Sequence, residues 1–320
     1  MGNISWISVF GRDYRGFQCD SGAYAAVFDG INDAATTNTD SHFPGIKSNG
    51  GIQNTCVISM WVKFDWTLSS VGNGGRFMIS QNATGVGSGN VDQFFRIAYT
   101  AKSGGGNPIN NLTVTYRGNG TSNQLEKIYG LDGTLNSIAT GSTSSSDYWA
   151  SDNTNITVND RGFVHICAIL TLPAYSSNPS LNESFSAGSL NTYWNGQLLQ
   201  NFTNNTQGVA QSDTNSLYGL LGANISNLSG LFPGKIDEMQ ALSDSFSQTS
   251  AFKTAYSLTT DQDIATFLWN NGCPIDTSGH SNASSWNYYN YRFENNWNSE
   301  NTSPYPMVGV NGATFSTDHA

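Results

Sequence analysis

The sequence has 320 residues, of which 11% are charged, and its formal net charge at pH 7 is −10. A chain of this length can bury a substantial core, as one large domain or two ordinary ones. Binding to phosphates requires clustered Lys and Arg, and the sequence has no such run, which excludes a nucleic-acid partner. No stretch is apolar for long enough to cross a bilayer, and the first six residues fit neither a secretory signal nor a myristoylation pattern.

The composition favours a folded all-β domain with long polar loops. Charge is low, aromatic residues make up 12% of the chain, and there are 34 glycines. The cysteines have no metal-ligand spacing and are interpreted as small apolar side chains, with two disulfides as the alternative. They are Cys19, Cys56, Cys167 and Cys273.

In chain order, residues 1–22 are expected to form an N-terminal arm ahead of a first strand at 24–28. Residues 57–64 are apolar on nearly every position, which predicts a central strand that is buried on both faces. The long polar stretch from 118 to 159 is expected to contain a short extra hairpin. Three shorter strands are predicted before it, at 76–80, 94–99 and 112–116.

A second buried strand is predicted at residues 162–172, where the chain returns to the core. Asn195-Gly196 then predicts a tight hairpin over residues 191–199, because both turn positions accept a positive φ. Strands at 217–222 and 234–242 complete the sandwich.

The strand at 234–242 departs from strict alternation. Ile236 and Met239, both apolar, are three positions apart. A β-bulge at Asp237-Glu238 is one way to return both side chains to the same face.

A helix is predicted after the sandwich, where Ile264, Phe267 and Leu268 recur at helical spacing. Thr260 can cap its first turn, and Asp263 suits the positive end of the helix dipole. The expected organisation is therefore an N-terminal arm at 1–22, a sandwich at 23–250, and a third segment at 251–320. In that last segment a strand is predicted at 288–293, and the helix and an extended tail pack on the sandwich or on a neighbour.

Five segments occur in the order expected of one family. They are VFDGIND at 27–33, ISMWVKF at 58–64, GFVHI at 162–166, YWNGQ at 193–197 and FPGKIDE at 232–238. With them the chain resembles the laminin-G and concanavalin-like lectin-glucanase jelly rolls. Residues and resemblance together predict an all-β fold: an antiparallel two-sheet jelly-roll sandwich with one short C-terminal helix and irregular N- and C-terminal arms.

Glucanases of the concanavalin-like class carry Glu-x-Asp-x-x-Glu on one strand, which places the carboxylates on one face, and this motif does not occur here. Asp237 and Glu238 are adjacent and would point to opposite faces of a regular strand. His165 falls inside a predicted core strand and is interpreted as a structural side chain. The sequence therefore predicts a protein that is not an enzyme.

Calcium is the cofactor that the resemblance implies, because many laminin-G-like domains bind it at one rim of the sandwich. The candidate ligands in family-like segments are Asp29, Asp33, Asp237 and Glu238, since hard oxygen ligands suit Ca²⁺. The alternative is that Asp29 and Asp33 shape a turn and that Asp237 or Glu238 bonds to loop amides.

Sugar binding requires an aromatic platform beside polar groups. Tyr148 and Trp149, flanked by Asp147 and Asp152 in the longest loop, fit this description, and Trp194 is a further candidate. The alternative for each aromatic side chain is that it packs a loop onto the sandwich.

These features of the sequence predict two alternative functions. The first is a structural protein on the surface of a virus particle of bacteriophage type, as a capsid decoration or tail-associated subunit. It would contact other virion proteins or copies of itself and could adsorb to cell-surface glycans, without membrane insertion. The second is a stand-alone carbohydrate-binding module or lectin located outside the cell.

Overall fold

The structure is a computed structural model in which part of the chain is described. The described residues are 24–37, 53–64, 75–83, 94–100, 111–117, 124–130, 162–171, 184–185, 189–199, 203–206, 209–210, 217–223, 230–245, 253–254, 256–270, 287–293, 295 and 307–317. The predicted N-terminal arm at 1–22 lies outside them.

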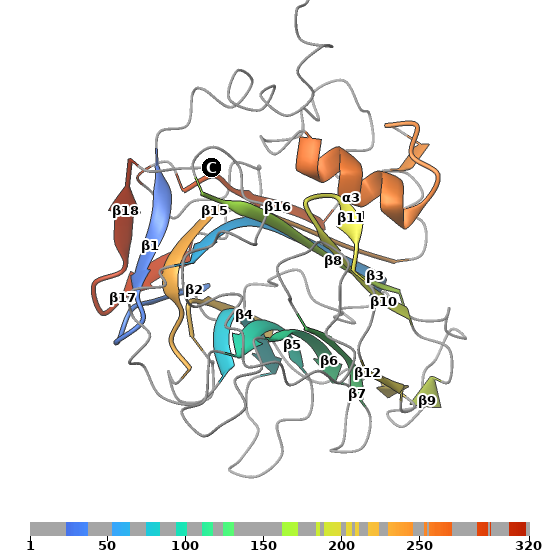
Figure 1. Ribbon diagram of the computed structural model, residues 1–320, viewed down its shortest axis with the longest axis horizontal. Helices are drawn as coiled ribbons and strands as arrows, with labels where there is room; N and C mark the ends of the chain where they lie inside the picture. The colour runs from blue at the N-terminus through green and yellow to red at the C-terminus, as the bar shows by residue number, and fades with distance from the viewer. Residues whose placement is uncertain are drawn as a thin grey trace, which may run out of the picture.

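Two antiparallel sheets of eight strands face each other (Figure 1). We call the first sheet A, and its strands follow the order β11-β10-β8-β3-β15-β1-β18, with β16 paired to β15. Their bounds are Gln197–Leu198 (β11), Ser189–Trp194 (β10), Val164–Thr171 (β8), Gln53–Phe64 (β3), Pro233–Ser245 (β15), Ala25–Asp29 (β1), Thr314–Ser316 (β18) and Asn287–Tyr291 (β16).

The second sheet, sheet B, has the order β12-β7-β6-β5-β4-β14-β2-β17. Its strands are Thr203–Thr206 (β12), Gln124–Gly130 (β7), Asn111–Arg117 (β6), Phe94–Thr100 (β5), Gly75–Ala83 (β4), Leu217–Leu221 (β14), Ala34–Thr37 (β2) and Met307–Val310 (β17). A separate small ladder pairs β9, Ser184–Phe185, with β13, Val209–Ala210. The predicted antiparallel two-sheet sandwich is confirmed.

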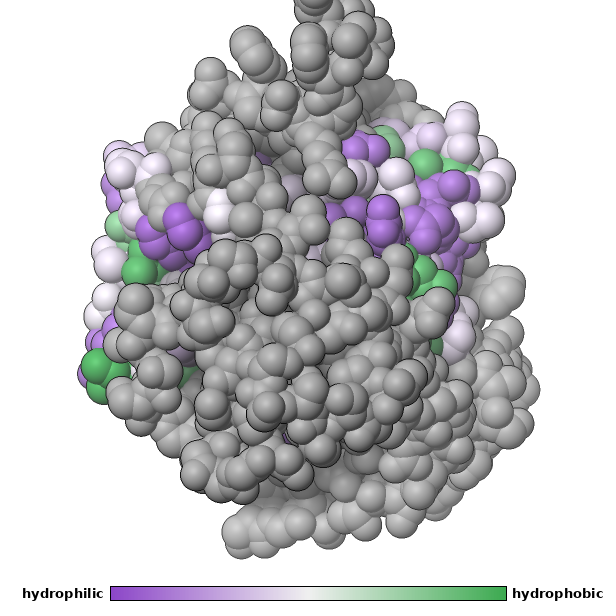
Figure 2. All heavy atoms as spheres, in the orientation of Figure 1, coloured by the Kyte–Doolittle hydropathy of each residue, from purple (hydrophilic) through white to green (hydrophobic). Residues whose placement is uncertain are grey.

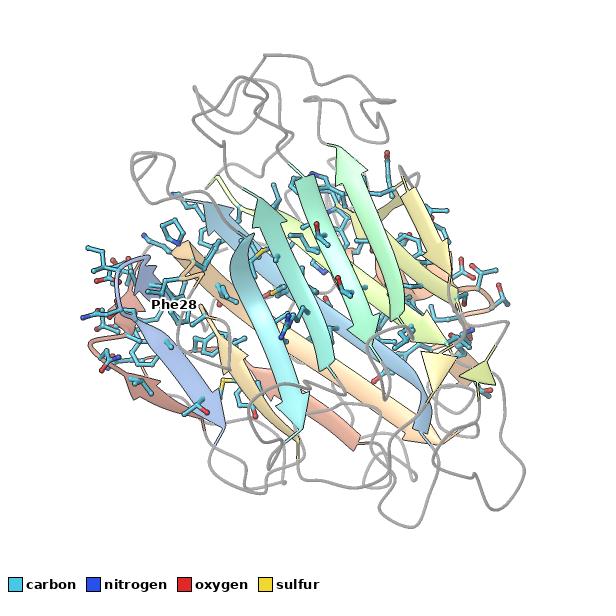
Figure 3. The ribbon with its side chains drawn as sticks, turned by 90° about the horizontal axis from the view of Figure 1, so that it is seen from below. Phe28 is labelled. Carbon is cyan, nitrogen blue, oxygen red and sulfur yellow. The ribbon has the colours of Figure 1, made fainter. Side chains whose placement is uncertain are left out.

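The main core lies between the sheets because alternate residues of each strand point inward. On β3 the inward residues are Ile58, Met60 and Val62, and Ile97 and Val114 face them from β5 and β6. Strand β3 lies between β8 and β15, so the predicted central strand is confirmed. Viewed from the sheet B side, the labelled Phe28 lies at the β1 end of this core (Figure 3).

Helix α3, Asp261–Asn270, lies on the face of sheet A that points away from sheet B (Figure 1). Its apolar side chains Ile264, Ala265 and Leu268 form a second core cluster with residues of β3, β8 and β10. Gln262 Nε2 also donates a hydrogen bond to the carbonyl oxygen of Gly196, in the turn between β10 and β11. Helix α3 therefore covers the outer face of sheet A at β8, β10 and the adjoining part of β3.

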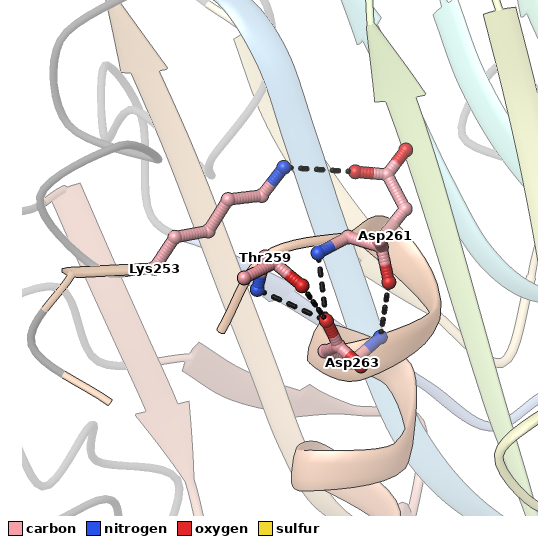
Figure 4. Close-up of polar contacts among 5 residues, drawn as sticks. Lys253, Thr259, Asp261 and Asp263 are labelled. Atoms are coloured by element: carbon pink, nitrogen blue, oxygen red, sulfur yellow. Dashed lines mark hydrogen bonds and ion pairs between the residues drawn. The ribbon is translucent and has the colours of Figure 1, made fainter. Parts of the chain in front are cut away.

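The start of α3 has the capping geometry that the sequence predicts (Figure 4). Thr260 Oγ1 accepts a hydrogen bond from Asp263 N at 3.1 Å, and Asp263 Oδ2 accepts one from Thr260 N at 2.8 Å. Thr259 adds a hydroxyl and an amide donor to the same carboxylate oxygen, and Lys253 Nζ lies 3.2 Å from Asp261 Oδ1. This reciprocal arrangement satisfies amides that a helix terminus leaves unbonded.

Acid is expected to weaken this cap. Hydrogen bonds from the Thr259 hydroxyl and the amides of Thr260 and Thr259 hold the pKa of Asp263 below its usual range. A carboxylate with a lowered pKa stabilises the fold above its unfolded-state pKa of about 4, and the contribution is lost as the pH falls toward the lowered value. Urea midpoints of the native chain and of Asp263→Asn should differ at neutral pH and converge in acid. A difference between the two urea midpoints that does not change with pH would contradict this prediction.

The β-bulge predicted in the last sandwich strand is present. The pairing of β15 with β3 shifts register between Asp237 and Gln240, and Glu238 has a φ of 44°. The Glu238 amide donates to Asp237 Oδ1 at 2.8 Å, and Ile236 and Met239 both reach the main core. The extra residue therefore restores the apolar face, as expected.

The strand predicted at 288–293 is present as β16, but the residues after it differ from the expected irregular tail. Strand β16 pairs with β15, β17 pairs with β2, and β18 pairs with β1. Tyr291, Phe293 and Met307 are buried in the main core. The sandwich thus extends past the predicted boundary at 250, because the C-terminal apolar residues complete the ends of both sheets.

Candidate functional site

The turn between β1 and β2 is built around two aspartates. Asp29 Oδ1 accepts hydrogen bonds from the amides of Ile31, Asn32 and Asp33, at 2.7, 3.0 and 3.3 Å. Asp33 Oδ2 accepts one from Asp29 N at 3.1 Å. Gly30, with a φ of 71°, supplies the left-handed residue of the turn. Both carboxylates therefore hold backbone amides of their own turn, which matches the turn-forming alternative.

The pKa values of the two carboxyl groups are shifted in opposite directions. Burial by itself raises the pKa of Asp29, but the amide hydrogen bonds outweigh burial, so its pKa lies below the usual value. Burial raises the pKa of Asp33; the Asp29 amide lowers it, the negative charge of Asp29 raises it, and the net direction is upward. Asp29 therefore stays negatively charged down to a lower pH than Asp33 does.

The other two predicted calcium ligands lie elsewhere. Asp237 and Glu238 are in the bulge, 3% and 6% exposed, whereas Asp29 is opposite Pro233 at the start of β15. Four residues of strand separate Pro233 from Asp237, about 13 Å. Among the described residues no three His, Cys, Asp or Glu side chains form a metal-binding group. The carboxylates of Asp29, Asp33 and Asp237 each accept a backbone amide of their own segment, and calcium binding stays a prediction.

The predicted sugar-binding aromatic residues divide into two groups. Trp194 is 2% exposed and packs in the main core between the sheets, so its ring is closed to a ligand. Its inward position follows from alternation along β10, where Leu190 also faces the core. Asp147, Tyr148, Trp149 and Asp152 lie outside the described residues.

His165 is fully buried on the outer face of sheet A. Its Nε2 lies 2.7 Å from Ser59 Oγ, and its ring centroid lies 5.2 Å from that of Trp61. The His165 backbone is bonded to Asn195 in both directions, at 2.9 Å and 2.8 Å. These contacts link β3, β8 and the β10–β11 turn, so the histidine has a structural role, as its sequence position predicts.

Two turns meet at one end of the sandwich. Asn311 Nδ2, in the turn between β17 and β18, donates to the carbonyl oxygen of Asn32 at 3.1 Å, across 279 positions of sequence. A Cβ atom on Gly312 would lie 3.1 Å from Asp33 Oδ1, so the two turns are in close contact. All of Ile31, Asn32, Asn311 and Gly312 are exposed, and we call these four residues the paired-turn rim.

The paired-turn rim combines apolar and amide groups. Ile31 is 68% exposed, the most exposed of the large hydrophobic side chains in the described part of the chain. The side-chain amide of Asn311 donates the hydrogen bond that joins the turns to the backbone carbonyl oxygen of Asn32, and both residues are exposed. In Figure 2 the surface at the β1–β18 end likewise mixes hydrophilic and hydrophobic residues. This end of the sandwich therefore offers a small apolar surface flanked by hydrogen-bonding groups.

Two lysines lie opposite each other in register on the outer face of sheet A. Lys63 on β3 and Lys235 on β15 are directly opposite in register, and both are half-buried. Val27 of β1 is the next neighbour across the sheet, two residues before Asp29. The sequence alone does not predict this pair, because the lysines are matched only by the register of β3 with β15.

The chain has the following similarities to known proteins. No protein-family model and no curated protein matches it. A putative carbohydrate binding protein from Bacteroides ovatus has a TM-score of 0.44 and 13% identity, over 92% of this chain and 60% of that chain. The CBM40 of the Ruminococcus gnavus IT-sialidase has a TM-score of 0.36 and 13% identity, over 73% and 97%.

A third similar structure is domain 4 of AbnA, a GH43 extracellular arabinanase from Geobacillus stearothermophilus, in complex with arabinotriose. Its TM-score is 0.31 with 15% identity, over 68% of this chain and 69% of that chain. The chain spans about 60% of the length of the first of the three structures. In the described part of the chain no helix is both long enough and apolar enough to span a bilayer.

Proposed function

We propose that the chain is a non-catalytic carbohydrate-binding domain whose binding surface is the paired-turn rim. The observation that carries this proposal is the meeting of Asn32 and Asn311 beside the exposed Ile31. An Asn amide both donates and accepts, and therefore matches sugar hydroxyl groups, which do the same. An aliphatic side chain can cover the C–H face of a sugar ring, so the rim offers both kinds of contact.

The rigidity of the turn supports the proposal. Three amides bonded to Asp29 Oδ1 and the amide of Asp29 bonded to Asp33 Oδ2 fix the backbone that carries Ile31 and Asn32. A surface that is already ordered loses little conformational entropy when a ligand binds. The two carboxylates hold amides in this arrangement, so the proposal gives them a positioning role and no part in bond cleavage.

Binding to a glycan array and calorimetry on any glycan that binds would test this function. Removing the rim amides with Asn32→Ala and Asn311→Gly should weaken binding about tenfold each, the usual loss for one or two hydrogen bonds. Glycine suits position 311 because Asn311 has a φ of 59°, which alanine adopts at a cost. Reducing-end assays should show no cleavage of the bound glycan.

Matched controls are available on other surfaces. Asn270 is exposed at the end of α3, and Leu198 is 45% exposed on β11. Asn270→Ala and Leu198→Ser should leave binding unchanged, whereas Ile31→Ser should reduce it. Equal effects at the rim and at the control positions would overturn the assignment of the rim, and a folded chain that binds no glycan would overturn the function.

The virion-surface role stays a prediction. A rigid sandwich with a glycan-binding end is compatible with a subunit that adsorbs a phage particle to a host cell, and with a domain of an extracellular protein. Electron microscopy of particles labelled with an antibody against this chain would separate the two settings.

A further inference from the structure

The dipeptide Asn-Gly forms two of the turns that the structure describes, at residues 195–196 and 311–312. In both turns the Asn has a positive φ, of 48° and 59°. Asn is a thermolabile residue, because the backbone nitrogen of the next residue can attack its side-chain carbonyl carbon. Glycine in that next position has no Cβ to hinder the approach. The same reaction is therefore open to both turns, and their surroundings decide where it occurs.

The turn at Asn195 is held by buried contacts. Asn195 is 6% exposed, its Oδ1 accepts the His165 amide at 2.9 Å, and its own amide donates to the His165 carbonyl oxygen at 2.8 Å. Gln262 Nε2 from α3 donates to the Gly196 carbonyl oxygen, and the ring of Trp269 packs against Gly196. Attack by the Gly196 nitrogen would require these contacts with β8 and α3 to open together.

The turn at Asn311 is held more weakly. Asn311 and Gly312 are both exposed. Asn311 Nδ2 donates to the Asn32 carbonyl oxygen at 3.1 Å, and the backbone bond of the turn, from Ala313 N to Val310 O, is 3.4 Å long. Strand β17 pairs with β2 and β18 pairs with β1, so the strands on either side of this turn lie in different sheets. Local opening of an exposed turn costs less free energy than opening of a buried one.

We propose that Asn311 is a site of spontaneous deamidation and that packing protects Asn195 from the same reaction. The Gly312 nitrogen loses its proton and forms a bond to Asn311 Cγ, and the bond between Cγ and Nδ2 breaks with release of ammonia. Water then opens the cyclic imide at either of its carbonyl carbons, which gives aspartate or isoaspartate. The overall change consumes water and releases ammonia, and it requires no oxidant and no enzyme.

Deamidation would disrupt the contact between the two turns of the paired-turn rim. A carboxylate has no N–H donor, so the bond from residue 311 to the Asn32 carbonyl oxygen is lost. The new negative charge also lies in a turn that contacts Asp33, since a Cβ atom on Gly312 would be 3.1 Å from Asp33 Oδ1, and like charges repel. The effect on glycan binding rests on the proposed function, whereas the reaction itself does not.

Peptide mapping of the native chain tests the reaction. The folded protein is incubated in warm, mildly alkaline buffer, and mass spectrometry follows the conversion of amide to acid in the peptides that contain Asn195 and Asn311. Asn311 should convert at least about tenfold faster, since an extra cost of opening of about 1.4 kcal/mol at Asn195 reduces its reactive population by that factor. The rate at Asn311 should rise with pH, because attack requires loss of the Gly312 amide proton.

The chain unfolded in urea is the matched control. Both Asn-Gly sequences are then free of tertiary contacts and should convert at similar rates. Equal rates in the folded chain, or faster conversion at Asn195, would overturn the inference. A difference that persists in urea would overturn it as well, because the neighbours in sequence would then be the cause instead of the packing.

A second readout connects the reaction to the rim. Ion exchange separates chains converted at Asn311, since they carry an additional negative charge. For any glycan that the fresh chain binds, this fraction and the Asn311→Asp variant should both bind about tenfold more weakly. Asn311→Gly cannot react at this position, so its binding, already reduced, should not fall further with incubation.

The outcomes separate the two proposals. If residue 311 converts and the converted chain binds the glycan as tightly as the fresh chain, the deamidation site stands and the rim is not the binding surface. If the glycan binds at the rim and Asn311 does not convert faster than Asn195, only the present inference is overturned. Conversion at Asn311 with loss of binding supports both.

Discussion

Alanine at position 234 is expected to destabilise the fold strongly and to lower the urea midpoint of unfolding. Gly234 has a φ of 150°, and its Cβ would collide with the backbone carbonyl oxygen of Lys63 and lie 2.8 Å from Phe232 Cζ. Neither neighbour can yield, because Lys63 is paired in the β3–β15 ladder and Phe232 is buried in the main core. Steric overlap and backbone strain together should cost about 3–5 kcal/mol.

Gly162 provides the matched control for this prediction. It also has a left-handed backbone, with a φ of 83°, but a Cβ there would meet only the flexible side chain of Lys63, at 3.3 Å. Gly162→Ala should therefore cost about 1–2 kcal/mol, from backbone strain alone. Urea unfolding measured on both variants separates the steric part from the conformational part. Equal losses would show that contact with the Lys63 carbonyl contributes nothing.

The second large effect concerns the contact between Phe28 and Gly222. Phe28 is 2% exposed, and its ring centroid lies 6.4 Å from that of Phe232. Phe28→Ala should cost about 3–5 kcal/mol through lost burial and the cavity that remains. Gly222 lies against the same ring, and its Cβ would be 2.5 Å from Phe28 Cδ1, so Gly222→Ala should cost about 3 kcal/mol.

The two substitutions should not add. Without the Phe28 ring, alanine at 222 retains only the strain of a φ of 80°, so the double variant should lose at least about 1 kcal/mol less than the sum. Gly196→Ala is the control, because Gly196 contacts Trp269 at the opposite end of sheet A. Combined with Phe28→Ala it should be additive to within about 0.5 kcal/mol. If the losses of stability were additive in both double variants, the contact between Phe28 and Gly222 would not be the cause of the Gly222→Ala effect.

The elements that sequence predicted best have strong local signals. The apolar run of β3, the Asn195-Gly196 turn and the Thr260–Asp263 cap each depend on chemistry within a few residues. The bulge at Asp237-Glu238 was predicted from a break in alternation, and the register shift there confirms it. In each case the local preference and the tertiary contacts agree.

The last two strands, β17 and β18, were missed although the turn between them carried a usable signal. Asn311-Gly312 lies between Val310 and Ala313, and is the same hairpin dipeptide as Asn195-Gly196. Strands β17 and β18 have only four and three residues, so their alternation is too short to stand out from an Asn-rich and Ser-rich background. The partners of these strands, β2 and β1, lie at the other end of the sequence.

The candidate site was predictable only in part. Asp29 and Asp33 were recognised in the sequence as turn formers or calcium ligands, and their bonds to backbone amides match the first alternative. Trp194 was misplaced, because a single aromatic residue in a hairpin gives no sign of which face it occupies until the register is known. The meeting of Asn32 with Asn311, and of Lys63 with Lys235, depends on long-range pairing alone.

The pairing of β17 with β2 and of β18 with β1 determines when this protein can finish folding during synthesis. Until residues 307–316 have left the ribosome, β1 and β2 would each have an unpaired edge, and such edges can pair with other nascent chains. A chaperone that shields those two edges during translation would therefore increase the yield of native protein.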